Sequence, residues 1–147
     1  MHSRLRHGSS ITLQLAMKGM LSALEQAEQL GVQVSLVIVD AASQTVHSSN
    51  MDRAPRPCHA IALNKALTAA GFGRSTAEWT DRLEGCSEAV KTGLPLQPNM
   101  ALFGGGEPFI WNGEVIVAIG VSGASEANDT LCAKAAVNSV LKLLAAE

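Results

Sequence analysis

The sequence has no surplus of positive charge and few cysteines. Its 147 residues include 11 lysines and arginines against 13 acidic residues, and the formal net charge is -2. Such a chain cannot displace many counterions from a phosphate backbone, so no nucleic-acid partner is expected. The three cysteines, Cys58, Cys86 and Cys132, are far apart. They match neither zinc-site nor thioredoxin-like spacing, and no metal site is expected.

Long apolar runs are also missing. The N-terminal segment carries Arg4 and Arg6, but polar residues interrupt the apolar positions that follow, so no signal peptide is expected. No run approaches the roughly 18 apolar residues that a membrane-spanning helix needs. Scattered cysteines are typical of a reduced compartment. We therefore predict a cytoplasmic protein with no membrane partner.

The sequence does have enough apolar residues for a core, because 47% of its positions are hydrophobic. A chain of this length fits one globular domain, so we predict a single domain over residues 1–147, with residues 1–10 as a loose tail. Surface-to-volume scaling limits how much apolar surface so small a domain can bury. We therefore predict that it forms a homo-oligomer, a dimer or larger.

Three segments show the three- and four-residue spacing of apolar positions that indicates an amphipathic helix. They are Thr12–Leu30 ended by Gly31, a helix that begins near Pro57 and ends at Gly71, and Ser125–Ala146. A weaker helical pattern covers residues 76–90. Residues 92–99 contain glycine and prolines and are predicted to form a loop.

Five further segments have the apolar or alternating pattern of β-strands. They are residues 32–40, 45–49, 100–103, 108–111 and 114–121. Asn112-Gly113 separates the last two, and both residues tolerate the positive φ of a type I′ hairpin turn. The order of the elements predicts an α+β domain with a largely antiparallel, five-stranded sheet packed against helices.

Six short motifs follow one another along the chain in a distinctive order. They are Thr12-Leu13, Val39-Asp40-Ala41, Met51-Asp52, Lys65 to Ala69, Phe103 to Pro108, and Ile119 to Gly123 followed by a helix carrying Asp129. In this order they resemble the GlcG/HbpS family, which includes the C-terminal domain of PduO-type proteins. The resemblance covers the chain from about Ile11 to the last helix.

The resemblance implies a profilin-like α-β-α sandwich, assembly into dimers or higher oligomers and, for some members, haem binding or a link to glycolate or corrinoid metabolism. Haem or a corrinoid is therefore the leading ligand class, but no single reaction is implied. The glycines usual after the strand-ending aspartate are replaced by Ala42 and Ser43, and Arg53 follows the Met-Asp pair. A ligand that approached those glycines closely would meet side chains here.

Haem would have to be held non-covalently, because the sequence has no Cys-x-x-Cys-His attachment motif. His59 and His47 are the candidate axial ligands, and each could equally be a surface or hydrogen-bonded histidine. The cations near enough in sequence to meet the propionates are Arg53, Arg56, Lys65 and Arg74.

An enzyme is the alternative function. Lys65, Asp40 and Asp129 lie near the ends of predicted elements, where a cleft could gather them. Lys65 and Asp40 could then transfer a proton on a small hydroxy or keto acid. A structural ion pair with a capping aspartate is the simpler interpretation and the one we prefer.

The position of the family motifs adds Phe103, Gly104, Gly105 and Ser122 as candidate ligand-binding residues, beside Asp129. With the second helix they would line a pocket. A tight β connection also explains the three glycines, because they lack the lysine and hydroxyl of a P-loop. A third interpretation is an oligomeric interaction module without a ligand. The apolar faces of the predicted helices, including Met17, Met20 and Leu24, are assigned to the core.

Overall fold

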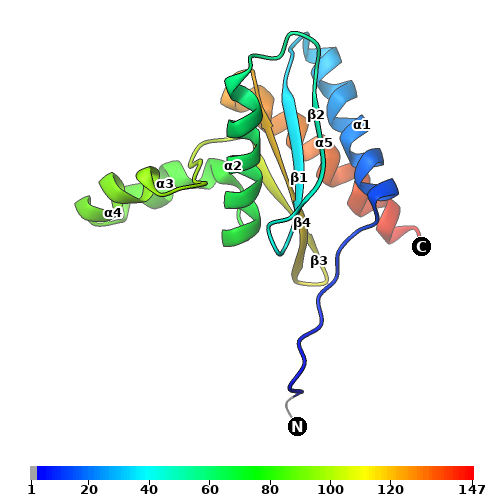
Figure 1. The fold of residues 1–147 in the computed structure, drawn as a ribbon, viewed down its shortest axis with the longest axis horizontal. Helices are drawn as coiled ribbons and strands as arrows, with labels where there is room; N and C mark the ends of the chain where they lie inside the picture. Colours follow the sequence, from blue (N-terminus) through cyan, green and yellow to red (C-terminus); the bar gives the residue numbers. More distant parts are fainter. Residues whose placement is uncertain (1–2) are drawn as a thin grey trace.

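The structure is a computed structural model that describes residues 3–147, and its centre is a four-stranded antiparallel sheet with helices on both faces (Figure 1). The strands are β1 (Ser35–Asp40), β2 (Thr45–Asn50), β3 (Gly106–Trp111) and β4 (Glu114–Ser122), and their order in the sheet is β2-β1-β4-β3. The inner strands β1 and β4 are largely buried, as their β-branched residues predict.

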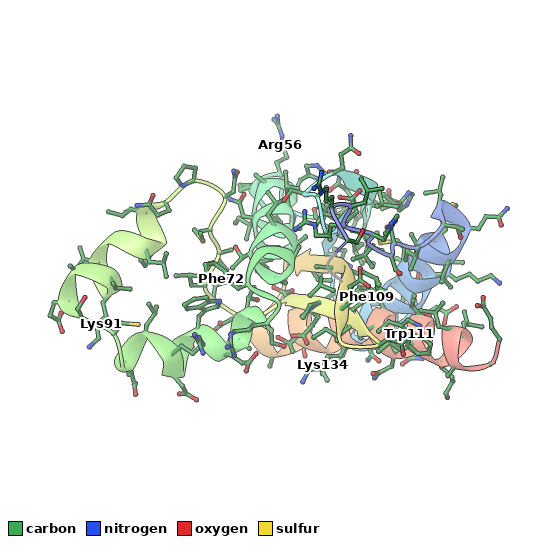
Figure 2. All side chains as sticks on the ribbon, turned by 90° about the horizontal axis from the view of Figure 1, so that it is seen from below. Arg56, Phe72, Lys91, Phe109, Trp111 and Lys134 are labelled. Carbon is green, nitrogen blue, oxygen red and sulfur yellow. The ribbon has the colours of Figure 1, made fainter. Side chains whose placement is uncertain are left out.

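One face of the sheet is covered by α1 (Leu13–Leu30) and α5 (Glu126–Ala145) (Figure 1). Leu36 of β1, Phe109 of β3 and Ile119 of β4 form the strand side of this core. Phe109 points inward between the sheet and the helices (Figure 2). The two helices pack closely, because a Cβ at Gly19 of α1 would lie only 2.8 Å from Val140 Cγ2 of α5.

The other face is covered by α2 (Pro57–Phe72). Small residues dominate this contact: Ala62, Ala66 and Ala69 of α2 pack on Val37, Val39 and Ala118 of the inner strands. A Cβ at Gly120 would lie 1.9 Å from the Ala62 carbonyl oxygen. The helix backbone therefore rests directly on β4, and glycine is the residue that permits it.

Several predicted element ends are confirmed. The Thr12 hydroxyl accepts a hydrogen bond from the Leu15 amide and begins α1, and Gly31 ends it with a φ of 71°. Asn112 and Gly113, with φ values of 52° and 77°, form the predicted hairpin turn between β3 and β4.

Residues 76–96, here called the arm, project from the body beside α2 (Figure 1). The arm consists of the 3-10 turn η1 (Thr76–Glu78), the short helices α3 (Trp79–Glu84) and α4 (Glu88–Gly93), and η2 (Leu94–Leu96). Its root is held by Thr76, which is fully buried. Thr76 Oγ1 accepts a bond from the Gly106 amide at 2.8 Å and donates one to the Gly106 carbonyl at 3.4 Å.

The prediction of five strands is wrong, because residues 100–103 form no strand. Asn99 has a φ of 63°, which turns the backbone just before this segment. The Ala101 amide then donates to Thr68 Oγ1 of α2 at 3.0 Å, so a helix side chain takes the place of a neighbouring strand.

Two helix predictions and one loop prediction also need correction. Helix α2 ends at Gly73, with a φ of 65°, and not at Gly71. The helical pattern over residues 76–90 is divided into η1, α3 and α4, and Ser87 caps the last of these. The predicted loop at 92–99 instead contains the end of α4 and η2.

Residues 3–12 precede α1 and form no helix or strand, although the Ser9 amide donates to Glu114 Oε1 at 2.7 Å. The first two residues of the predicted tail lie outside the described part of the chain. None of the helices in residues 3–147 is long and apolar enough to cross a bilayer.

Candidate functional site

The centre of the motif-bearing region is a buried ion pair between Lys65 of α2 and Asp129 of α5. Lys65 Nζ donates to Asp129 Oδ2 at 2.9 Å and to the Val121 carbonyl of β4 at 2.8 Å. Nζ also lies 5.1 Å from the centre of the Phe103 ring. The two charged side chains are only 1% and 3% exposed. A buried pair of this kind is tolerated only when its remaining hydrogen-bonding groups are satisfied.

Asp129 connects the pair to the end of β4. Its second carboxylate oxygen accepts a hydrogen bond from the Ala124 amide at 2.9 Å. Burial raises the pKa of Asp129, and the hydrogen bond and positive charge of Lys65 oppose that shift. The carboxylate therefore depends on Lys65 for its charge compensation. The pair ties α2, β4 and α5 together.

The glycine-rich segment lies directly against this lysine. A Cβ at Gly105, whose φ is +126°, would lie 2.6 Å from Lys65 Nζ and 2.5 Å from the Val121 carbonyl. A Cβ at Gly106 would lie 2.5 Å from the Lys65 carbonyl. The predicted meeting of the lysine helix and the glycine loop is therefore present, but protein atoms fill the space where a shared pocket was expected.

The other motif residues lie around this junction. Phe103 is 43% exposed with its ring over Lys65, and Ser122 is buried at the end of β4. The Gly104 amide donates to Glu126 Oε1 at 2.8 Å. Gly104 also borders a small cavity of about 330 Å³ between the arm and α5, together with Thr80 and Thr130.

Asp40 does not join Lys65. Its Oδ1 accepts hydrogen bonds from the Ala42 and Gln44 amides, both at 2.9 Å, and so fixes the turn between β1 and β2. Asp40 lies opposite Val117 on β4, whereas Lys65 binds the carbonyl of Val121 on the same strand. Four residues of strand span roughly 13 Å. The two proposed proton-transfer groups therefore lie in different places.

The two candidate histidines have different surroundings. His59, in the first turn of α2, pairs its Nδ1 with Asn50 Oδ1 at 3.0 Å. The nearby Arg53 and Arg56 are exposed, and Arg56 points away from the body (Figure 2). Arg74 is also exposed, beyond the far end of α2.

His47 instead borders a cavity of about 510 Å³ between α1 and β2. The cavity walls are made of thioethers and leucines, from Met17, Met20, Met51, Leu21, Leu24 and Leu36. Polar groups are contributed by Glu28, Gln33, Ser49, Asn50 and Asp52. His47 Nε2 is paired with Ser49 Oγ at 3.0 Å. This cavity therefore combines an imidazole with apolar, sulfur-rich walls.

The sequence patterns do not predict this cavity, because they assign both Met17 and Met20 to the core. Met20 is buried, but Met17 is 46% exposed. The signal that could have identified the cavity is the pair of methionines three residues apart on α1, with a third methionine directly after β2.

Glu107 is a second residue that the sequence patterns do not single out, and it is only 7% exposed although it lies on the edge strand β3. Ser75 Oγ donates a hydrogen bond to Glu107 Oε2 at the root of the arm. Burial raises the pKa of Glu107, the Ser75 bond and Lys134 lower it, and Glu78 raises it further. The signal was a carboxylate directly after three glycines, in the turn between two predicted strands.

Comparison with known proteins gives a consistent picture. A family model described as "Haem degrading protein HbpS-like" matches residues 11–138. A 15.0 kDa uncharacterized protein from the dhaT-dhaS intergenic region of Citrobacter freundii is 35% identical over 135 residues, which cover 92% of this chain and 95% of that protein. The corrinoid adenosyltransferase PduO of Salmonella typhimurium is 30% identical over 119 residues, 81% of this chain but only 35% of PduO.

Solved structures with similar folds extend the comparison. The Klebsiella pneumoniae protein ORFY has a TM-score of 0.88 and 30% identity, covering 96% of this chain and 97% of that one. A crystal structure of a PduOC–heme complex has a TM-score of 0.81 and 29% identity, covering 88% of this chain and 94% of that one.

Proposed function

The chain belongs to the HbpS-like family, and we propose that it is a small-ligand-binding or accessory protein whose leading ligand class is haem or a corrinoid. The observation that carries this proposal is the cavity between α1 and β2, in which His47 stands among thioether and leucine side chains. The heme complex of the structurally similar PduOC supports the same ligand class.

The donor set of the cavity fits a metal-bearing tetrapyrrole. Haem iron in proteins commonly takes histidine, or histidine with methionine, as axial ligands. His47 Nε2 is paired with Ser49 Oγ, and in the tautomer in which Nε2–H donates to that hydroxyl, Nδ1 has a free lone pair for the metal. When bound, such a group would supply redox or ligand-binding chemistry. His47 would hold it, and the leucine walls would exclude water.

The rim of the cavity distinguishes between the two ligand classes. Glu28 and Asp52 also border it, and their carboxylates would repel the propionates of haem. Exposed Arg53, next to Asp52 in the chain, is the cation that could offset this repulsion. A corrinoid carries amide groups in place of propionates, so the same carboxylates, with Gln33 and Asn50, could accept its hydrogen bonds.

Titration of the purified protein with hemin tests the proposal. We expect a shifted Soret band that reaches saturation for the wild type and is lost in His47→Ala. His59→Ala is the matched control, because it removes the other candidate ligand, a residue that does not itself line the cavity. A parallel titration with aquocobalamin tests the corrinoid. Identical spectra for the wild type and His47→Ala with both ligands would contradict the proposed site.

We also propose that the protein functions as a homo-oligomer. Leu13, Met17 and Leu21 of α1 are 53%, 46% and 55% exposed. Their four-residue spacing lays them along one side of the helix as an apolar stripe. Light scattering that returned a monomer of 15.3 kDa at micromolar concentration would contradict this. A cytoplasmic location and the lack of a nucleic-acid partner stay predictions from composition.

The separation of Lys65 from Asp40 argues against the enzyme interpretation. Lys65 Nζ is committed to Asp129 and to the Val121 carbonyl, and it is 1% exposed. A proton-transfer group must reach its substrate within hydrogen-bond distance. No second function is therefore proposed.

A further inference from the structure

We propose that the cavity between α1 and β2, when it holds no tetrapyrrole, binds a soft monovalent metal ion of the copper(I) class through Met17, Met20 and His47. Four methionines lie in residues 3–147, and three of them border this one cavity. The same cavity includes His47. This inference goes beyond the tetrapyrrole proposal and does not depend on it.

The donors come from two facing walls of the cavity. Met17 and Met20 are three residues apart on α1, which puts their Cβ atoms about 5–6 Å apart on one side of the helix. His47 and Ser49 alternate along β2 and both border the cavity, so they share the strand face that looks toward α1. The helix therefore offers two thioethers to an imidazole on the strand.

The hydrogen bonds that these groups already make decide which of them can bind the metal ion. Met51 Sδ already accepts a hydrogen bond from the Val34 amide at 3.3 Å, so it is not counted among the ligands. When His47 Nε2–H donates to Ser49 Oγ, Nδ1 carries the free lone pair that a metal needs. Methionine side chains have three rotatable bonds, so the sulfurs of Met17 and Met20 can adjust to a common ion.

The chemistry of the donors selects the metal. Thioether ligands favour copper(I) over hard divalent ions. Within the described residues, no three histidine, cysteine or acidic side chains gather as a metal-binding group, so a zinc-type site is not offered there. Glu28 and Asp52 border the same cavity and favour a positively charged occupant. On the inner side, buried Leu36 and half-buried Leu24 limit the access of water.

The test uses silver(I), a redox-stable probe with the same preference for thioethers, and the full-length protein labelled with ¹³C at its methionine methyl groups. Cys58 and Cys86, which are half-buried free thiols, are replaced by serine to limit thiol binding. We expect the methyl signals of Met17 and Met20 to shift and to saturate at one ion per chain. The Met100 signal, from a residue beside a different cavity, should not shift. Binding that leaves the Met17 and Met20 signals unmoved would overturn the proposal.

A pair of matched variants gives a second readout. Met17→Leu with Met20→Leu keeps apolar side chains of similar volume and removes both sulfurs, whereas Met100→Leu makes the same change elsewhere. In native mass spectrometry we expect the double variant to lose one silver ion per chain relative to Met100→Leu. Equal silver stoichiometry in the two would overturn the proposal. Hemin titration of the same variants keeps the two proposals apart, because Met17→Leu with Met20→Leu retains His47 and the apolar walls, so the Soret shift should persist where the silver ion is lost.

Discussion

The Lys65–Asp129 junction and the α1–β2 cavity differ in how tightly they are filled. At the junction, a buried ion pair, a strand carbonyl and a glycine backbone are in direct contact. At the cavity, about 510 Å³ is left between a helix and an edge strand. Three of the six family motifs meet at the junction, and only Met51-Asp52 reaches the cavity. The motifs thus mainly specify how the sheet and helices join, while ligand-facing residues come largely from other positions.

The largest expected effect on stability comes from replacing the lysine at the junction. Lys65→Met would leave the buried carboxylate of Asp129 without its partner, and removal of one member of a buried ion pair costs about 3–5 kcal/mol. Urea denaturation should show that loss in the free energy of unfolding. The double variant Lys65→Met, Asp129→Leu should recover part of it, because no charge is then left unpaired. A single variant as stable as the wild type would show that the junction does not hold the fold.

The second test adds one methyl group to the same junction. Gly105→Ala would bring a Cβ to 2.6 Å from Lys65 Nζ, at a φ of +126° that alanine rarely adopts. We expect a loss of about 1–3 kcal/mol in the free energy of unfolding. Gly71→Ala is the control, since a Cβ there meets nothing within 4 Å and Gly71 lies inside helix α2. That change should be neutral or stabilising. Equal effects of the two changes would contradict the close packing described for Gly105.

The smallest expected effect is on the pH dependence of stability, and it tests Glu107 at the root of the arm. Burial raises the pKa of Glu107 above its ordinary 4.5, so the folded state binds its proton more tightly than the unfolded state does. The contribution of Glu107 to stability is therefore complete below pH 4.5 and is lost as the pH rises through the folded pKa. One proton can change the free energy of unfolding by at most about 1.4 kcal/mol per pH unit.

Glu107→Gln stays neutral and should remove this component. Asp129 also has a raised pKa and acts in the same direction, but it is present in both proteins, so its effect cancels in the difference between them. Urea unfolding at several pH values should show that the wild type loses stability relative to Glu107→Gln as the pH rises from 4.5. A constant difference, or one of opposite sign, would mean that burial does not govern Glu107.

The sequence predicted best where local chemistry decides the structure. Thr12 and Gly31 limit α1, and Asn112-Gly113 turns the chain, through hydrogen bonds and φ preferences within a few residues. The meeting of Lys65 with Gly105 was also predicted, but from the order of family motifs and not from any local pattern. The order of the family motifs indicated which segments meet, but it did not indicate how tightly they pack.

The features that were not predicted depend on tertiary contacts, which sequence patterns do not reveal. Residues 100–103 are apolar enough for a strand, yet Thr68 of α2 takes the Ala101 amide. Met17 follows the same helical stripe as Met20 but is exposed. An apolar stripe predicts that a helix packs on a sheet. It does not predict which residues of the stripe lie beyond the edge strand. Here β2 is that edge, and the cavity forms beside it.

The hydroxyl of Thr76 has one more consequence, for aggregation. β3 forms an outer edge of the sheet, where unpaired amides could recruit a strand from another molecule. Thr76 occupies both main-chain groups of Gly106, and Pro108, two residues on and facing the same way, has no amide hydrogen to offer. This end of the edge is therefore a poor template for the addition of a strand from another molecule.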